Sequence, residues 1–236
     1  MEPKNKRVVP FFDSIAPHYD LVNRIASLGI DNRWRSRGIE LLWEELEKKG
    51  ESKIVDIATG TGKMVEILHR LAEKRGKKVE IFGVDPSRKM LEIAQKRYPF
   101  AQFRQGVGEA LPFPSNFADG VTLAFGLRNF SDRKKGIEEI GRVLKPGGVV
   151  MILEFVKGRG NLRKIVDFYT AQIVPLVGSL FSGNREAYSY LSSSIQHFYT
   201  APQLAKMVEG EGFELLHNFT SNFGQVLTLL ARKKEK

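Results

Sequence analysis

The stretch Ile54-Val55-Asp56-Ile57-Ala58-Thr59-Gly60-Thr61-Gly62 decides the fold that we expect of this chain. Its first half is an apolar run typical of a buried strand, and its second half is a turn of small residues. Small residues let the backbone turn tightly and let a ligand approach it closely. A helical pattern follows at Lys63–Arg75, so the first amide groups of that helix would point at whatever the turn holds. The stretch therefore predicts a strand, a ligand-binding turn and a helix in succession.

The same alternation of apolar runs and helical patterns continues along the chain. Further strands are expected at Val79–Val84, Gly120–Phe125, Val149–Phe155, Phe213–Phe219 and Gln225–Ala231, and further helices at Ser87–Arg97, Ser131–Leu144 and Ala201–Gly210. The first strand covers Lys53–Ala58. Alternating strands and helices are typical of βαβ units, in which the strands are parallel and ligands bind at their carboxyl ends. The fold class is therefore α/β.

The chain of 236 residues is long enough for one domain with a sizeable core. We expect residues 1–236 to form a single domain. Its parts would be a helical lead-in at 8–50, a ligand-binding core at 51–156, a helical cap inserted at 157–200, and a helix with a strand pair at 201–236.

The composition excludes several classes of protein. Lys and Arg number 37 against 27 Asp and Glu, a net charge of +10, but the basic residues are scattered along the chain. We therefore expect no nucleic-acid partner. The absence of cysteine excludes disulfides and thiolate sites, and the four histidines lie far apart, so no metal site is expected. No apolar run approaches the roughly 18 residues of a membrane-spanning helix, and the start lacks the pattern of a signal peptide. A soluble, cytoplasmic protein is expected.

Asp85 ends the second predicted strand, 25 positions beyond Gly60. An acidic residue at this place in a nucleotide-binding α/β fold typically accepts hydrogen bonds from the ribose hydroxyls. A helix cap is the alternative, because Asp85 also precedes the predicted helix that starts at Ser87. The two roles are compatible.

The charge around the turn favours a methyl donor over a dinucleotide. Met64, Val65 and Glu66 occupy the region where a dinucleotide would need a third glycine. Asp56 places a negative charge where a cationic sulfonium and its amino group would be attracted and a pyrophosphate would be repelled. The residues therefore favour S-adenosylmethionine as the ligand.

These motifs also resemble a known family. Asp56-x-Ala58-x-Gly60-x-Gly62, Asp85, residues 109–113 (EALPF) and residues 142–148 (RVLKPGG) are similar to the successive motifs of class I methyltransferases. Residues 19–23 (YDLVN), 27–30 (SLGI) and 125–129 (FGLRN), together with Pro175, Gly178, Tyr188, Tyr190, Leu191, Ser194 and Ile195, resemble the ubiquinone/menaquinone biosynthesis C-methyltransferases. The resemblance extends from about Phe11 to Leu230.

The resemblance implies a Rossmann-like fold and a reaction. The sheet would have seven strands, mostly parallel, with the last strand antiparallel, and the enzyme would methylate a ring carbon of a prenylated quinol with S-adenosylmethionine as donor. Matched to the family's motifs, Thr61 and Asp85 would bind the donor, with Val107 and Gly108 beside its adenine. The full set expected at the donor is Asp56, Ala58, Gly60, Thr61, Gly62, Asp85, Val107 and Gly108.

The chain departs from the family's usual pattern at several positions. Val107-Gly108 stands where Asn-Ala is usual, so a side-chain hydrogen bond near the adenine is lost. Ala124 replaces a serine, Asn32 replaces a histidine, and residues 199–201 replace Pro-Asp-Gln. None of these changes affects the glycines or Asp85, so donor binding is still expected, and the identity of the acceptor is left open.

Three residues are candidates for catalysis. A quinol carbon becomes nucleophilic when its ring hydroxyl loses a proton, so a base or a cation that stabilises the phenolate is expected. Arg128, Tyr19 and Asp20 could serve, whereas His18 beside a proline indicates little by itself. The alternatives are an ion pair with a neighbouring carboxylate for Arg128, and lid packing and a helix cap for Tyr19 and Asp20.

The segment 157–200 contains apolar residues at roughly helical spacing, among them Phe168, Tyr169, Ile173 and Val174. Such a stripe is typical of core packing, and a groove for a lipid tail is the competing interpretation. The expected partner is a small lipid-like quinol, with peripheral contact at the inner face of the membrane and the oligomeric state left open.

Other functions remain open at this point. The same fold could methylate another small molecule or a lipid, or the chain could bind the donor without catalysing transfer. The intact glycines, Asp56 and Asp85 argue against the last of these.

Overall fold

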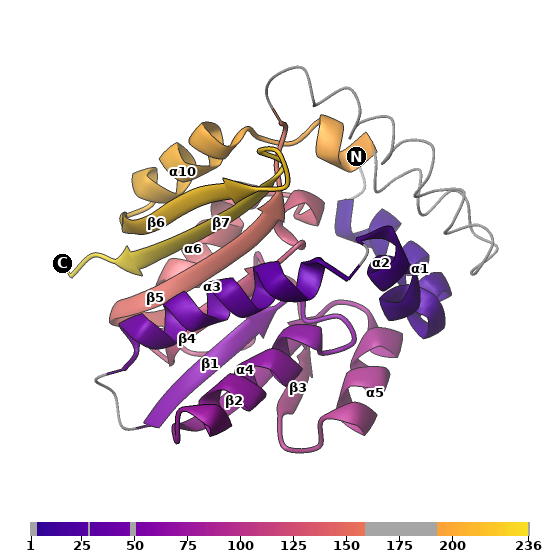
Figure 1. Cartoon of the computed structure of the whole chain (residues 1–236), viewed down its shortest axis with the longest axis horizontal. Coiled ribbons are helices and arrows are strands. Elements are labelled where there is room, and N and C mark those ends of the chain that lie inside the picture. Colours follow the sequence, from indigo (N-terminus) through magenta and orange to yellow (C-terminus); the bar gives the residue numbers. More distant parts are fainter. Residues whose placement is uncertain (1–3, 28, 48–50, 159–192, 236) are drawn as a thin grey trace.

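A computed structural model describes residues 4–27, 29–47, 51–158 and 193–235 of the chain. Its centre is a seven-stranded sheet with the strand order β3-β2-β1-β4-β5-β7-β6 (Figure 1). The strands are β1 (Glu51–Ile57), β2 (Lys78–Asp85), β3 (Gln102–Gln105), β4 (Ala118–Ala124), β5 (Leu144–Phe155), β6 (Phe213–Ser221) and β7 (Val226–Lys233). The chain thus builds one half of the sheet outward from β1 to β3 and then returns to add the other half beside β1.

The direction of the strands follows the expected pattern. β1 pairs in parallel with β2 and with β4, and β5 continues the parallel set beside β4. β7 is antiparallel to both of its neighbours, β5 and β6. The order reverses between β1 and β4, and ligands of such sheets bind at the carboxyl ends of the strands beside this reversal.

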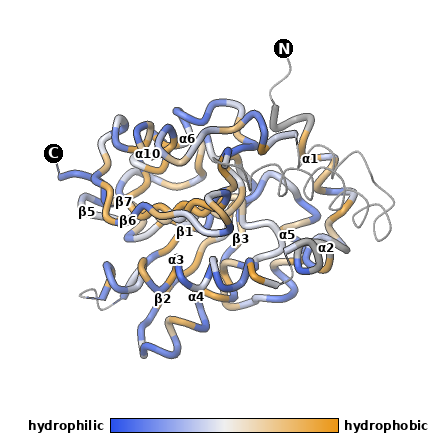
Figure 2. Tube along the Cα trace, turned by 45° about the horizontal axis from the view of Figure 1, so that its top comes forward, coloured by the Kyte–Doolittle hydropathy of each residue, from blue (hydrophilic) through white to orange (hydrophobic). Residues whose placement is uncertain are grey.

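Helices cover both faces of the sheet. The helices α3 (Asp31–Glu45) and α4 (Lys63–Lys74) pack on one face, and α6 (Arg133–Val143) and α10 (Ala201–Gly210) pack on the other (Figure 2). The helix α5 (Arg88–Arg97) packs against β2 and β3. In α4, Met64, Val65, Leu68 and Leu71 recur at helical spacing and are buried. Burial of each large apolar side chain contributes about 1.5–3 kcal/mol, so packing on the sheet holds this helix in place.

The lead-in begins with two helices at the edge where the parallel strands end. They are α1 (Lys4–Ile15) and α2 (Tyr19–Ala26), joined by the short helix η1 (Ala16–His18) (Figure 1). α1 contacts α5 and the short helix η2 (Leu127–Asn129), which follows β4. These two helices therefore lie over the carboxyl ends of the parallel strands rather than on one of the faces of the sheet.

The comparison with the sequence confirms the Rossmann-like fold, the seven strands and the antiparallel last strand. The apolar pattern by itself did not predict β3, because this four-residue edge strand is mostly exposed and lacks an apolar run. The strand expected at Val149–Phe155 begins five residues earlier than predicted. It is β5, which starts at Leu144 and includes Pro146 and Gly147, and Gly147 has a positive φ of 68°. Most of the expected cap at 157–200 lies outside the described residues.

Among the helices that the structure describes, none is long and apolar enough to cross a membrane.

Candidate functional site

The turn after β1 has the backbone geometry of a ligand-binding loop. Ala58, Gly60 and Gly62 all have positive φ, at 54°, 55° and 86°. A methyl group on Gly60 would meet nothing within 4 Å, whereas one on Gly62 would lie 2.7 Å from the ring of Tyr98. Ala58 accepts a conformation that non-glycine residues seldom adopt, a strain typical of functional loops. The loop backbone therefore faces open space at Gly60, whereas at Gly62 it packs tightly against Tyr98.

Asp85 fastens this turn to the end of β2. Its Oδ2 accepts a hydrogen bond from the Gly60 amide at 2.9 Å, and its Oδ1 accepts one from the Ser87 amide at 2.9 Å. Ser87, not Asp85, is the N-cap of α5, because its hydroxyl accepts from the Met90 amide. Burial raises the pKa of Asp85 to about 6, and the charge of Asp13 adds to this, against the lowering effect of the two amide bonds. Each carboxylate oxygen retains a lone pair for a ligand hydroxyl.

Asp56 lies beneath the turn and is completely buried. Its Oδ1 accepts a hydrogen bond from the Thr122 hydroxyl at 2.7 Å. Its Oδ2 makes no hydrogen bond of normal geometry within the described chain, although the Thr59 hydroxyl, which also lacks such a bond, lies close enough to act on the carboxyl. Burial raises the pKa of Asp56 to about 6, although the hydroxyls of Thr59 and Thr122 and the charge of Arg35 lower it. A buried carboxylate oxygen without a partner is costly, so this group fits a site that a positively charged ligand group completes.

A cavity opens at the carboxyl ends of β1, β2 and β4 and encloses about 690 Å³ of empty space, including the part open to solvent. Its wall includes Val8, Val9, Phe12, Tyr19, Ile57, Ala58, Gly60, Asp85, Pro86, Met90, Gly106, Val107, Gly108, Glu109, Ala124, Phe125, Gly126, Asn129 and Phe130. The wall is mostly apolar, with Asp85 and backbone groups as its polar part, as expected of a nucleoside pocket.

Phe130 fills the wall beside Gly108. A methyl group on Gly108 would lie within 2.8 Å of three atoms of the Phe130 ring, and one on Gly136 within 2.6 Å of two of them. The Phe130 ring thus lies in a slot between Gly108 and Gly136, and the slot is wide enough only because neither residue has a side chain. This explains why glycine stands at position 108, where alanine is usual in the family that the chain resembles.

Glu109 holds the neighbouring loop in place. Its Oε1 accepts hydrogen bonds from the amides of Ser131 at 2.6 Å and Asp132 at 3.3 Å, just before α6. Glu109 is itself buried. The loop after β3 is therefore fixed to the start of α6 on the far side of Phe130.

The lead-in helices close the cavity from outside. Val8, Val9 and Phe12 of α1 and Tyr19 of α2 contribute to its wall, and the Phe12 and Tyr19 rings pack edge to face with 6.0 Å between centroids. Of these residues only Tyr19 was singled out in the sequence, although positions 8, 9 and 12 follow helical spacing. The lead-in is therefore part of the site.

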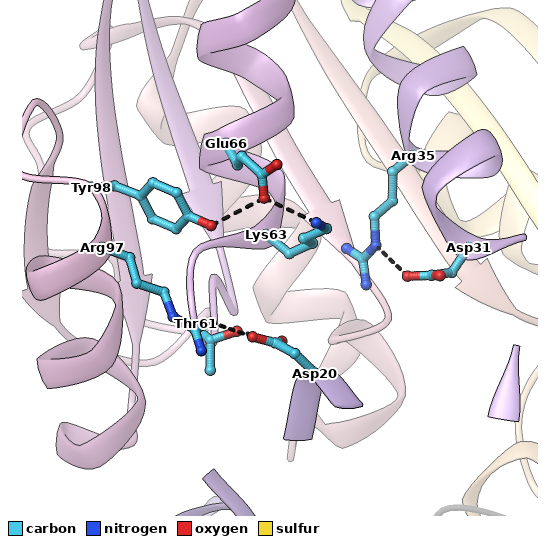
Figure 3. A network of polar contacts seen from close by, with 8 residues as sticks. All are labelled: Asp20, Asp31, Arg35, Thr61, Lys63, Glu66, Arg97 and Tyr98. Carbon is cyan, nitrogen blue, oxygen red and sulfur yellow. Dashed lines mark hydrogen bonds and ion pairs between the residues drawn. The ribbon is translucent and has the colours of Figure 1, made fainter. Parts of the chain in front are cut away.

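Two polar contacts attach the lead-in to the donor side. The hydroxyl of Ser87 donates to Asp13 of α1. The hydroxyl of Thr61 donates to Asp20 of α2 at 2.7 Å, and Asp20 also pairs with Arg97 at the end of α5 (Figure 3). The polar groups of Asp20 and Thr61 are therefore used in binding the lead-in to the glycine turn.

Arg128 lies in η2 and is buried, with only 3% of its surface exposed. Its guanidinium pairs with Glu154 of β5 at 2.7 Å and donates to the carbonyl of Phe125. The Glu154 carboxylate also accepts from the Arg128 amide at 3.2 Å. The structure thus places Arg128 in the ion pair considered as the alternative in the sequence, and its side chain is not part of the cavity wall.

The candidate residues divide into two groups. Ala58, Gly60, Asp85, Val107, Gly108 and Tyr19 line the cavity, whereas Asp56, Thr61, Gly62, Asp20 and Arg128 lie behind its wall. Phe130 and Phe12 were missed by the sequence reasoning. The pair of glycines at 108 and 136 was the available signal for Phe130. Among the described residues, no three His, Asp or Glu side chains gather into a metal-binding group.

Comparison with known proteins gives a family match over almost the whole chain. The model of the ubiE/COQ5 methyltransferase family matches residues 1–233. A demethylmenaquinone methyltransferase of Thermotoga maritima is 44% identical over 212 residues, which are 89% of each chain. A ubiquinone/menaquinone biosynthesis C-methyltransferase UbiE of Campylobacter jejuni is 36% identical over 233 residues, 98% of this chain and 99% of the relative.

Solved structures share the fold at lower identity. The [4+2]-cyclase SpnF has a TM-score of 0.69 at 20% identity, over 99% of this chain and 97% of the cyclase. A methyltransferase of Thermotoga maritima dependent on S-adenosylmethionine has a TM-score of 0.61 at 19% identity, over 96% of this chain and 100% of that protein. At such identities the likeness concerns the fold alone.

Proposed function

The chain belongs to the ubiE/COQ5 methyltransferase family, and on that premise we propose that it transfers the methyl group of S-adenosylmethionine to a ring carbon of a prenylated quinol. The acceptor would be a demethylmenaquinol-like compound or a precursor of ubiquinol. The relatives at 44% and 36% identity carry the names of such enzymes and match nearly their full length. The observation that carries the proposal is the combination of this match with an apolar cavity at the carboxyl ends of β1, β2 and β4.

The residues of the cavity fit S-adenosylmethionine. The family and the fold imply this donor, which supplies an electrophilic methyl group on a sulfonium sulfur. Gly60 leaves open space where its side chain would be, so backbone and ligand can approach closely. Asp85 accepts the ribose hydroxyls with its remaining lone pairs. The unpartnered Oδ2 of Asp56 attracts the positive charge of the amino group and sulfonium, even where a water lies between.

The orientation of the donor follows from the strands that carry these residues. Asp85 at the end of β2 fixes the ribose, so the adenine lies toward β3 and the loop at Val107 and Gly108, with Phe130 as its apolar wall. The methionine end then lies at the ends of β1 and β4, where the strand order reverses. No side-chain hydrogen bond from position 107 is available to the adenine, so the base is held by packing.

Catalysis by this chain consists chiefly of alignment. Holding two reactants in line can lower a barrier by about 7–11 kcal/mol, and the mostly apolar wall of the cavity limits the access of water to the methyl group. Tyr19 borders the cavity and is the residue that we assign to the acceptor's hydroxyl. Arg128 acts through the turn that it holds: its pairing with Glu154 and Phe125 fixes Gly126 and Asn129, both of which line the cavity. Asp20 positions Thr61 and the glycine turn.

A prenylated acceptor also implies contact with a membrane. Leu21 and Ile30 expose 47% and 40% of their surface, and Phe223, between β6 and β7, exposes 67%. Val226 pairs with Phe155 at the carboxyl end of β5, so Phe223 lies at the same edge of the sheet as the cavity. We propose that this edge touches the inner face of the membrane, from which the acceptor's ring enters the site.

A two-stage experiment tests the proposal. Isothermal titration with S-adenosylmethionine comes first, followed by a transfer assay on reduced demethylated quinols, with the methyl position on the product ring determined by mass spectrometry and NMR. Gly60→Val is the matched negative control, because its side chain would enter the cavity. Donor binding without transfer to any quinol would overturn the acceptor class, and a wild-type protein that binds no donor would overturn the proposal as a whole.

A further inference from the structure

Arg35 of α3 is a buried cation that the reaction described above does not use. Only 8% of its surface is exposed. Its single hydrogen bond to the described part of the chain runs from Nε to Asp31 Oδ2, at 3.4 Å. Asp31 is shared, because its Oδ1 accepts from the Ser27 hydroxyl at 2.9 Å. The two terminal nitrogens of Arg35 therefore make no hydrogen bond to any described residue, and they point away from Asp31 (Figure 3).

A buried guanidinium that makes so few hydrogen bonds is unusual in a folded protein. It stays charged at every working pH, and a buried charge is stable only when its hydrogen-bonding groups are satisfied. Asp31 satisfies one of five N–H groups at a long distance. The remaining groups form a planar fork, which matches a carboxylate with two parallel hydrogen bonds. Arg35 is therefore suited to an anionic ligand group.

Two contacts place Arg35 beside one end of the cavity, although it is not itself one of the wall residues. Its guanidinium carbon lies over the ring of Phe125, 5.0 Å from the centroid, and Phe125 lines the cavity. Its charge also acts on Asp56 and lowers the pKa of that buried carboxyl, against the larger effect of burial. Phe125 follows β4 and Asp56 lies in β1, so Arg35 lies at the reversal of the strand order.

The methionine end of the donor reaches the same place. With the ribose on Asp85 at the end of β2 and the base toward β3, the opposite end of the ligand lies over β1 and β4. That end is a zwitterion, with a cationic amino group and an anionic carboxylate. Asp56 Oδ2 is the buried acceptor without a partner, and Arg35 is the buried donor with free nitrogens. The two charges of the site complement the two charges of the ligand.

We propose that Arg35 binds the carboxylate of the methyl donor's methionine moiety. This inference rests on the proposed function only for the identity of the donor, since it concerns no property of the acceptor. The acceptor's phenolate is the other anion that the reaction forms. The carboxylate is favoured because Arg35 acts on Asp56, the residue beneath the donor turn.

The test is a titration series with ligands that differ only at the methionine end. The ligands are S-adenosylmethionine, S-adenosylhomocysteine, decarboxylated S-adenosylmethionine and 5′-methylthioadenosine, which lacks the amino acid. They are titrated into wild type, Arg35→Gln, Arg35→Lys and Arg37→Gln. Arg37 is the matched control, because it lies on the same helix with its side chain 57% exposed and paired to Glu40.

We expect Arg35→Gln to lose roughly ten- to a hundredfold in affinity for the two ligands that carry a carboxylate, the usual value of a hydrogen bond to a charged group. Its affinity for 5′-methylthioadenosine and for the decarboxylated donor should stay within about twofold of wild type, a change that lies near the error of such titrations. Arg35→Lys should fall between the two, since it keeps the charge without the fork, and Arg37→Gln should match wild type.

Three results would overturn the inference. Equal losses for all four ligands would mean that Arg35 supports the fold of the site. Unchanged donor affinity with slower transfer would assign Arg35 to the acceptor. Wild-type affinity for S-adenosylmethionine equal to that for its decarboxylated form would remove the carboxylate contact altogether. Failure of wild type to bind any of the ligands would instead overturn the proposed function, and Arg35→Lys keeps the test open if the Gln variant does not fold.

Discussion

Replacing Gly108 by alanine tests the slot that holds Phe130. The new methyl group would lie within 2.8 Å of three ring atoms, a distance that real side chains do not tolerate. The ring cannot turn aside on the other flank, because Gly136 approaches it equally closely. Phe130 is 5% exposed and packs in the core, so the backbone after β3 or the ring itself must shift.

The cost of this shift is that of overpacking. Extra carbon in a well-packed core typically costs about 1–3 kcal/mol, and we expect the upper half of this range because the obstacle is a rigid ring held on two sides. For a domain of this size, about 2–3 kcal/mol lowers the melting temperature by roughly 4–12 °C. Donor affinity should fall as well, since Phe130 and Gly108 both line the cavity.

The assay is thermal and urea unfolding of four proteins, with donor titration alongside. Gly108→Ala and Phe130→Leu are measured alone and combined, and Gly141→Ala in α6 is the control, because its methyl group would meet Phe213 at an ordinary 3.6 Å. The smaller leucine should restore much of the stability that Gly108→Ala removes. A Gly108→Ala protein as stable as wild type, or a double variant in which the two losses simply add, would refute the slot.

Asp85→Ala should weaken donor binding by about 1.5–3 kcal/mol and raise KM for the donor more than it lowers kcat. A collapse of kcat at unchanged donor affinity would contradict the ribose contact. Donor affinity of wild type should fall as the pH drops from 7 to 5, because Asp56 and Asp85, whose pKa values burial raises to about 6, must be ionised to bind it. The stability of the free protein should change in the opposite direction with pH. The raised pKa values of the same two groups stabilise the folded protein at low pH, and this contribution is lost as the pH rises through 6. Donor titration and unfolding at matched pH values distinguish the effect on affinity from the effect on stability. Arg128→Ala should lower both kcat and thermal stability because it leaves the buried Glu154 unpaired, whereas reduced turnover in a protein of unchanged stability would give Arg128 a direct role toward the acceptor. Phe223→Asp should reduce cosedimentation with phospholipid vesicles severalfold, and Phe100→Asp, at an exposed phenylalanine before β3 at the opposite edge, should not; equal effects of both would refute the membrane-facing edge.

The sequence predicts those parts of the molecule in which one local pattern dominates. Four apolar runs bounded by turn residues locate the parallel strands because such strands are buried on both faces. β3 escapes this reasoning, since an exposed edge strand of four residues carries no apolar run. β5 begins before its apolar stretch, because Leu144 pairs with Ala118 of β4, and a register shift separates this pair from the next one, Gly120 with Val149. Strand pairing, rather than apolar pattern, sets these boundaries.

The site divides in the same way. The glycine turn and Asp85 are local motifs, and their positions in the cavity follow from the motif. Arg128 and Thr61 have partners far away in the sequence, Glu154 and Asp20 respectively. No spacing rule indicates such pairs, because they depend on how β5 and α2 are placed in three dimensions. The chemistry of a residue type could be predicted from the sequence, but its partner could not.

The attachment of the lead-in has a consequence for the order and pace of turnover. Val8, Phe12 and Tyr19 line the cavity together with Gly60 and Asp85, so the docked lead-in helices narrow the path of a ligand into and out of it. Undocking requires the Asp13–Ser87 and Asp20–Thr61 hydrogen bonds to break together. Both bonds end on elements beside the proposed donor site, so we expect departure of S-adenosylhomocysteine to be coupled to their opening. We expect release of the by-product to be slower than methyl transfer, and a first turnover faster than those that follow would be its kinetic signature.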